Sequence, residues 1–280
     1  MQWILSLVLA GGIGLSLGLM GGGGSVLALP VLVYVMGVPP KSAIAMTLVI
    51  VGTVSLLGLI PHWRAGNVNL KTALVFGSAT MVGTFTGAKI ATLPVVSETF
   101  QMLLFAVVML LAAGFMIYRS ARPLKTDDLL ALYPQPVCRF CWLWLLIEGL
   151  GVGILTGLVG VGGGFAIVPA LVLLAKVPMK QAIGTSLLII IANSVSGFLG
   201  YLGHVDLDWH LMVSFIFAAS LGTIPGAYLA QFVPAQRLQK VFGYFLLVVA
   251  TFVLVQNRQS LSLSRTIEEG MAQTTVQRYW

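Results

Sequence analysis

Charged residues are scarce in this chain. Only 8% of its 280 residues are Asp, Glu, Lys or Arg, against about 25% in an average soluble domain. A water-soluble fold of this size needs charged side chains to cover its surface. The composition therefore excludes a soluble globular protein and makes lipid the solvent for most of the chain.

Cysteine, histidine and acidic residues are equally sparse. The two cysteines, Cys138 and Cys141, form a lone CxxC with no second ligand pair, so we expect two reduced thiols. There is no HExxH and no acidic pair at helical spacing inside an apolar segment, which argues against a membrane enzyme. We expect no cofactor and no metal. The net charge of +7 is spread between apolar runs, so it reports membrane orientation and not a nucleic-acid surface.

Apolar sequence is what the chain has in abundance, at 58% of its residues. A helix needs about 20 apolar residues to cross a bilayer. Apolar segments fall at 2–20, 25–36, 41–61, 70–93, 98–118, 142–159, 165–175, 180–203, 209–232 and 236–256. The sequence therefore predicts an all-α, polytopic protein of the cell (inner) membrane.

The second half of the chain repeats the first when the sequence is shifted by 139 residues. Gly18 falls on Gly157, Pro30 on Pro169 and Lys41 on Lys180. Matched glycines, prolines and a lysine are not expected from chance similarity of apolar sequence. We predict a first membrane repeat at 1–118, a polar connecting loop at 119–140, a second repeat at 141–256 and a polar tail at 257–280. The tail is expected to be disordered or to lie on the membrane surface.

The relative orientation of the two repeats depends on the path of residues 2–36. A hairpin there gives each repeat an odd number of crossings, so the repeats are inverted. One long bent helix makes them parallel, with eight spans. The hairpin places about twice as many Lys and Arg residues on one side as on the other, so the positive-inside rule favours inverted repeats and a cytoplasmic central loop.

Two glycine-rich runs occupy matching places in the repeats. Consecutive glycines hold a helix poorly, and broken backbone inside a membrane is tolerated only where protein or water surrounds it. Each run therefore predicts a helix break whose free N–H groups suit an anion, although glycines also serve close helix packing, the explanation we favour for Gly18 and Gly157 alone. The candidate anion ligands are Gly21, Gly22, Gly23, Gly24 and Ser25 in the first run and Gly160, Gly162, Gly163 and Gly164 in the second.

The pattern G-L-x-G-x-G-G-G with a proline five or six residues later, in both halves, resembles the TauE/SafE family of sulfite exporters and related anion permeases. It is carried by Gly157–Gly164 with Pro169 and by Gly18–Gly24 with Pro30, where Ser25 stands in place of the last glycine. The resemblance extends from about residue 5 to residue 258. It implies transport of sulfite, a sulfonate, thiosulfate or another small anion. It fixes neither the anion nor the direction of transport.

Polar residues inside the apolar segments are further candidates. Asn193 carries an amide that must find partners in hydrocarbon, either a substrate or another helix. Ser194 and Ser55 occupy matching positions and join it as candidate substrate ligands. A hydrogen bond between helices explains such isolated hydroxyls equally well.

Three ionisable residues are candidates for coupling or gating. Lys41 and Lys180 each follow a proline at the start of a segment, where a lysine either extends to the interface or attracts anions. Glu148 lies inside an apolar run and is a candidate proton carrier, although it is close to the start of that run. His62 and Arg64 are expected in a solvated loop.

Together these residues predict a secondary transporter that binds a small oxyanion at the glycine breaks and alternates access by rocking one repeat against the other. The partners expected are the anion and the lipid bilayer, with no nucleic acid, and a homo-oligomer stays open. The alternative is a non-transporting membrane interaction or assembly protein, in which the glycines serve only packing.

Overall fold

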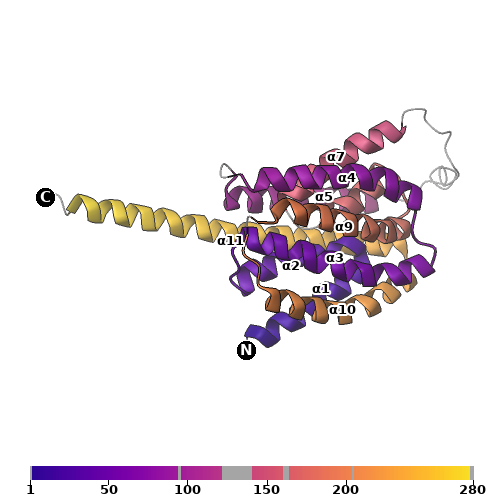
Figure 1. The fold of residues 1–280 in the computed structure, drawn as a ribbon, viewed down its shortest axis with the longest axis horizontal. Helices are drawn as coiled ribbons and strands as arrows, with labels where there is room; N and C mark the ends of the chain where they lie inside the picture. Colours follow the sequence, from indigo (N-terminus) through magenta and orange to yellow (C-terminus); the bar gives the residue numbers. More distant parts are fainter. Residues whose placement is uncertain (1, 94–95, 122–140, 160–163, 204, 278–280) are drawn as a thin grey trace.

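The computed structural model describes residues 2–93, 96–121, 141–159, 164–203 and 205–277, and every regular element among them is helical. The helices, drawn in Figure 1, are α1 (Gln2–Met20), α2 (Ser25–Pro30), α3 (Pro40–Arg64), α4 (Leu70–Ala91), α5 (Glu98–Ala121), α7 (Cys141–Val159), α8 (Gly164–Leu173), α9 (Met179–Tyr201), α10 (Trp209–Phe232) and α11 (Ala235–Gln277). Their bounds follow the predicted apolar segments closely. The largest difference is at the C-terminus.

Seven helical segments of the described chain are long and apolar enough to cross a membrane. An eighth, Leu143–Val159 of α7, is apolar but shorter. These segments confirm the prediction of an all-α, polytopic membrane protein. The tail expected to be disordered or on the membrane surface is instead a continuation of α11 to Gln277, which extends beyond the bundle in Figure 1.

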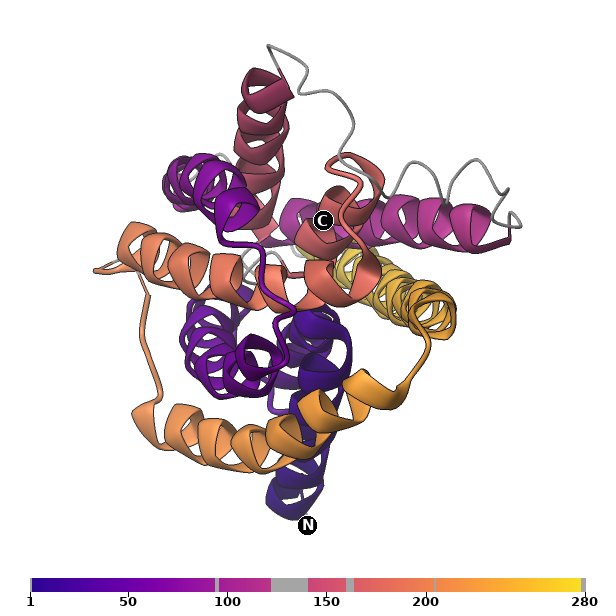
Figure 2. The same ribbon diagram turned by 90° about the vertical axis from the view of Figure 1, so that its right-hand side faces the viewer.

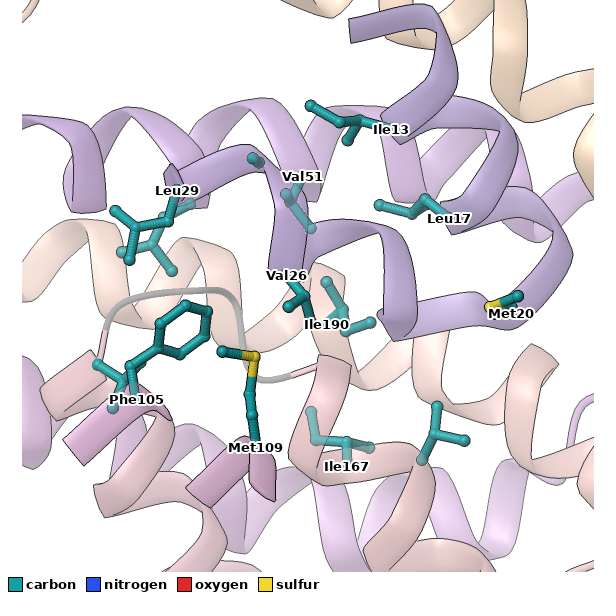
Figure 3. Packing of buried hydrophobic residues seen from close by; sticks show 14 of the residues in the cluster. Ile13, Leu17, Met20, Val26, Leu29, Val51, Phe105, Met109, Ile167 and Ile190 are labelled. Atoms are coloured by element: carbon teal, nitrogen blue, oxygen red, sulfur yellow. The ribbon is translucent and has the colours of Figure 1, made fainter. Parts of the chain in front are cut away.

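The chain reverses direction after α1. A tight turn of the 3-10 type, Gly21–Gly24, separates α1 from α2. A Cβ atom placed on Gly24 would collide with Leu17, which shows that the chain runs back along α1 instead of continuing it. Figure 3 shows the same reversal, since Val26 and Leu29 return past the helix that carries Leu17 and Met20. Residues 2–36 therefore form a hairpin and not one long helix.

Helices α3 and α9, which the 139-residue shift matches, run antiparallel. Close contacts pair Gly58 with Leu187 and Gly197 with Leu48, so the start of one helix lies beside the end of the other. Both termini lie at one end of the bundle in Figure 1, whereas α7 begins at the opposite end. Inverted repeats require both features. The duplication itself stays a prediction.

Two pairs of helices are joined through glycine faces. Gly14 and Gly18 of α1 pack directly on the backbone of α10, and Gly153 and Gly157 of α7 pack on that of α4. A Cβ atom at any of these positions would lie closer than 3.0 Å to backbone atoms of the partner helix. Small residues spaced four apart allow this close approach of membrane helices. For Gly18 and Gly157 the packing role that the sequence favours is confirmed.

These pairs divide most of the helices into two bundles. We call α1, α3 and α10 the first bundle, and α7, α9 and α4 the second bundle, because α3 also packs on α10 and α9 on α4. The two bundles meet where α3 crosses α9. Helices α5 and α11 pair with each other beside them, as Figure 2 shows along the bundle axis. Each bundle thus contains helices from both predicted repeats.

Candidate functional site

The first glycine run forms a buried turn inside the protein. Gly21 has φ +65°, a left-handed conformation that glycine adopts without steric cost, and Gly21–Gly24 are all buried. The Ser25 hydroxyl donates to the carbonyl of Gly22 at 2.6 Å, which closes the turn. The hydroxyl proton of Ser25 is therefore already used within the turn.

The two glycine runs touch each other. A Cβ atom on Gly22 would collide with the backbone of Gly164, the first residue of α8, and a Cβ atom on Gly164 would collide with Gly22. The structure therefore brings one candidate from each run into direct contact. The other candidates of the second run, Gly160, Gly162 and Gly163, lie outside the described residues.

Helices α9 and α11 form part of the surroundings of the first run. A Cβ atom on Gly21 would lie 2.7 Å from the Ser186 hydroxyl oxygen, and one on Gly23 would lie 2.6 Å from the Phe242 ring. The Ser186 hydroxyl donates to the carbonyl of Ile183 at 2.8 Å. The first run thus lies in mostly apolar surroundings, where electrostatic interactions are stronger than in water.

Asn193 is fully buried and only half satisfied. Its side-chain oxygen accepts a hydrogen bond from the Thr80 hydroxyl at 3.1 Å, which joins α9 to α4. Its amide nitrogen has no partner among the described residues. A buried, unpaired donor is costly, and functional sites are one of the few places where such groups are kept.

Ser55 and Ser194 are buried hydroxyls at the crossing of α3 and α9. A Cβ atom on Gly52 would lie 2.6 Å from the Cβ of Ser194, and Ser55 follows Gly52 by three residues on α3. Neither hydroxyl oxygen has a hydrogen-bond partner among the described residues. The crossing of the two bundles thus carries two unpaired polar groups, next to the unpaired amide of Asn193.

The candidates therefore form two groups at different depths. The first glycine run contacts α9 at Ile183 and Ser186, whereas Asn193 and Ser194 lie further along that helix. Seven residues of α-helix, from Ser186 to Asn193, correspond to about 10 Å along the axis. The single site expected from the sequence is thus an extended region between the glycine contact and the α3–α9 crossing.

Two of the three ionisable candidates, Lys41 and Lys180, lie at the starts of their helices. Lys180 donates from Nζ to the carbonyl of Gln231 at 2.9 Å, so its charge satisfies an orphan carbonyl at the C-terminal end of α10. Lys41 is half-buried at the start of α3, and Glu148 is half-buried on α7 beside Gly149, which packs against Phe76 of α4.

Sequence reasoning placed His62 in a solvated loop, and the structure corrects this. His62 lies in the last turn of α3 with 2% of its surface exposed, and its Nε2 is 3.1 Å from the carbonyl oxygen of Gly18. Arg64 is exposed, as expected. The 139-residue shift matches His62 with Tyr201, which also lies near the end of its helix. The Tyr201 hydroxyl donates to the carbonyl of Gly157 at 3.2 Å, so the two matched residues make matching bonds.

An apolar groove of about 460 Å³ also lies on α3, away from the glycine contact. Its lining is hydrocarbon apart from one guanidinium, and it consists of Leu56, Leu57, Leu59, Ile60, Trp63 and Arg64. A small oxyanion needs several donors to replace its hydration shell. This groove suits hydrocarbon and not such an anion.

Comparison with known proteins decides the family. The model of the sulfite exporter TauE/SafE family matches residues 6–259. The chain belongs to the TauE/SafE family. It is 33% identical over 261 residues to a "Probable membrane transporter protein" of Xylella fastidiosa, covering 92% of this chain and 97% of that protein. It is 28% identical over 220 residues to "Probable membrane transporter protein YdhB" of Bacillus subtilis, covering 77% and 84%.

No solved structure matches this TauE/SafE protein. The family membership makes the chain a multi-pass membrane transporter of the cell membrane and not an enzyme. The resemblance seen in the glycine runs is thereby confirmed at the level of the family.

Proposed function

We propose that this TauE/SafE protein is a secondary transporter of a small, sulfur-containing oxyanion such as sulfite, a sulfonate or thiosulfate. The family name supports the chemical class. The observation that carries the proposal is the direct contact between Gly22 and Gly164, which joins the first glycine turn to the start of α8 inside the protein. Glycine at both positions leaves backbone, and no side chain, facing the other run.

The anion is held, in this proposal, by neutral donors and not by a buried cation. Backbone N–H groups near the glycine contact and at the start of α8 carry partial positive charge. Asn193, Ser194 and Ser55 add donors without a present partner. Neutral donors bind an anion without the cost of burying an opposite charge, and they release it more easily than a fixed cation does.

The packing alters the motion expected from the sequence. Because α1 is locked on α10 and α7 on α4 through glycine backbones, neither predicted repeat can move by itself without separating these faces. Because the glycine faces hold each bundle together, the first and second bundles are the two bodies that can move relative to each other. Their crossing at α3 and α9, with the unpaired hydroxyls of Ser55 and Ser194, is the surface at which access alternates.

Flux in proteoliposomes tests the proposal directly. Purified protein is reconstituted, and uptake of radiolabelled sulfite, thiosulfate, a short alkyl sulfonate, sulfate and acetate is measured under gradients of the anion, of protons and of sodium. We expect saturable flux of at least one sulfur oxyanion and thermal stabilisation of the detergent-solubilised protein by the same anion. Flux of none of these anions, under any gradient, would contradict the proposal and favour the interaction protein.

A further inference from the structure

The last carbonyls of an interrupted helix are left without partners. In an α-helix each carbonyl accepts from the N–H four residues later, so the final four carbonyls have no such donor. Helix α1 ends at Met20, where the 3-10 turn Gly21–Gly24 begins, and the described part of α7 extends to Val159. An unpaired carbonyl there costs several kcal/mol in hydrocarbon, by general estimates. Its oxygen also presents negative charge close to the proposed anion site.

One buried side chain reaches a carbonyl in the last described turn of each of these two helices. His62 of α3 lies 3.1 Å from the oxygen of Gly18, and Tyr201 of α9 lies 3.2 Å from the oxygen of Gly157. A carbonyl can only accept, so the Nε2 of His62 carries the proton of this bond. Both side chains are almost completely buried, at 2% and 0% exposure.

The two bonds occupy positions that the 139-residue shift matches on both sides. Gly18 matches Gly157 and His62 matches Tyr201, yet an imidazole and a phenol share no chemistry except one donor. Different side chains that make the same bond indicate that the bond, and not the side chain, is required. Gln101 of α5 adds a donor to the neighbouring carbonyl, that of Leu158, at 3.1 Å.

We infer that His62 and Tyr201 are positioning residues that tie the C-terminal ends of α1 and α7 to the ends of α3 and α9, and that the His62 bond holds the first glycine run in the conformation that accepts the anion. Each of these two bonds, which we call a cap, engages a lone pair of a carbonyl that would otherwise repel the anion. The His62 bond also ties the first hairpin to the end of α3, and the Tyr201 bond ties α7 to the end of α9, so movement at the α3–α9 crossing is transmitted to both helix ends. This inference rests on the proposed function.

Hydrogen exchange and transport kinetics test the inference on the full-length protein. The variants are His62→Leu, which removes the donor, His62→Gln, which keeps one, and Tyr201→Phe, which removes only the hydroxyl. His210→Gln and Tyr244→Phe are the matched controls, because both side chains are exposed. Amide exchange is followed in the last turns of α1 and α7, and KM and maximal rate are measured for sulfite.

We expect Tyr201→Phe to speed exchange in the last turn of α7 only, and His62→Leu to do so in the last turn of α1 only. The KM for sulfite should rise about five-fold in each, the change expected for one net hydrogen bond. His62→Gln should resemble the unmodified protein, and so should both controls.

Unchanged exchange in both helix ends would overturn the inference, whatever happens to KM. If exchange responds as expected but the unmodified protein carries none of the anions, the caps stand and the proposed function falls. If exchange responds while KM stays constant, the caps serve stability alone and the inference of a positioning role is overturned.

Discussion

The first and second bundles share their backbone packing but differ in buried polarity. Both are built on glycine faces, α1 on α10 and α7 on α4. The second bundle carries Thr80, Thr156 and Asn193 at positions where the first bundle has Ala219, Leu17 and Val54. Thr156 lies 3.3 Å from Thr84, and Thr80 donates to Asn193. In the first bundle Thr223 donates to the carbonyl of Gly14 at 3.0 Å and His62 to that of Gly18 at 3.1 Å, so its bonds between helices end on backbone carbonyls.

This difference shows that the packing of the bundles needs the glycine faces but not the buried polar side chains. The first bundle closes the same glycine faces with apolar side chains at these positions, so buried amides and hydroxyls are not required for the fold. Polar groups inside a membrane bundle are costly when they are incompletely paired. The unpaired amide of Asn193 in the second bundle is therefore a better candidate for contact with the anion than the apolar residue at the matching position of the first bundle.

The largest expected effect comes from breaking the contact between the two runs. Gly22→Val and Gly164→Val should each abolish transport, because the added side chain would collide with the backbone of the other run. Flux per folded protein is measured in proteoliposomes, with the folded fraction taken from size-exclusion chromatography. Gly22→Ala keeps the added volume small and tests the contact if the valine variants do not fold.

Gly12→Ala and Gly151→Ala are the matched controls for this prediction. Nothing lies within 4 Å of a Cβ atom at either position, and both are helical. Alanine is about 1 kcal/mol better than glycine inside a helix, so these variants should transport normally and melt slightly higher. Normal flux by Gly22→Ala and Gly164→Ala alike would refute the functional importance of the contact.

Cross-linking distinguishes the bundles from the predicted repeats as moving bodies. In a background with Cys138→Ser and Cys141→Ser, the pair Leu48→Cys and Gly197→Cys joins α3 to α9, where a Cβ on Gly197 would lie 3.3 Å from Leu48. Oxidation of this pair should lower the transport rate at least ten-fold, because the disulfide fixes the crossing between the bundles. Reduction of the disulfide should restore transport.

The control pair joins the two repeats within one bundle. Gly11→Cys and Ala218→Cys link α1 to α10, where a Cβ on Gly11 would lie 3.7 Å from the backbone of Ala218. Cross-linking this pair should leave most of the flux intact. The opposite pattern, loss with the α1–α10 link and activity with the α3–α9 link, would restore rocking of one repeat against the other.

A smaller effect is expected when the second bundle is made to resemble the first. Asn193→Val introduces the residue found at the matching position, Val54. The KM for the anion should rise about ten-fold, by loss of one charge-assisted hydrogen bond, while the melting temperature changes little because an unpaired amide is removed with the bond. Thr80→Ala removes the bond to Asn193 together with the bond to the carbonyl of Gly77 in the same helix. It should cost roughly 0.6 kcal/mol of stability and leave KM unchanged. A lower melting temperature with an unchanged KM for Asn193→Val would assign Asn193 to helix packing.

The smallest effect is expected for the lysine that joins the bundles at one end. Lys180→Met removes the bond to the carbonyl of Gln231 and should lower stability by about 1 kcal/mol without changing flux. Lys41→Met is the comparison at the matching position of α3. Melting temperature and flux at low and high salt are the measurements. A salt-dependent rise in KM for both variants would support attraction of anions by the two lysines instead.

Local sequence chemistry was enough to predict the helices and their interruptions. Apolar runs of about 20 residues and consecutive glycines determine these through short-range physics, and the observed helix break after Met20 follows from the glycines at 21–24. The end of α11 was predicted less well. Polarity alone does not decide whether residues after Gln256 continue a helix that has already begun.

Burial and partners could not be predicted for the candidate site. His62 lies two residues from Arg64 and precedes a turn with glycine at φ +70°, which is why the sequence favours a loop. Its burial depends on α1, which lies 44 residues away along the chain. The separation of Asn193 from the glycine contact likewise depends on how far α9 extends past the turn.

The sequence by itself determined that this chain spans a membrane, that a helix is interrupted after Met20, and that it resembles a family of anion transporters. These properties follow from composition and from residues close together along the chain. Only the tertiary structure decided that Gly22 touches Gly164, that helices from both predicted repeats share each bundle, and that His62 and Tyr201 bond to the carbonyls of Gly18 and Gly157. The reason is physical, since contacts between distant segments depend on how glycine faces allow helices to approach, and that geometry is not encoded at any single position.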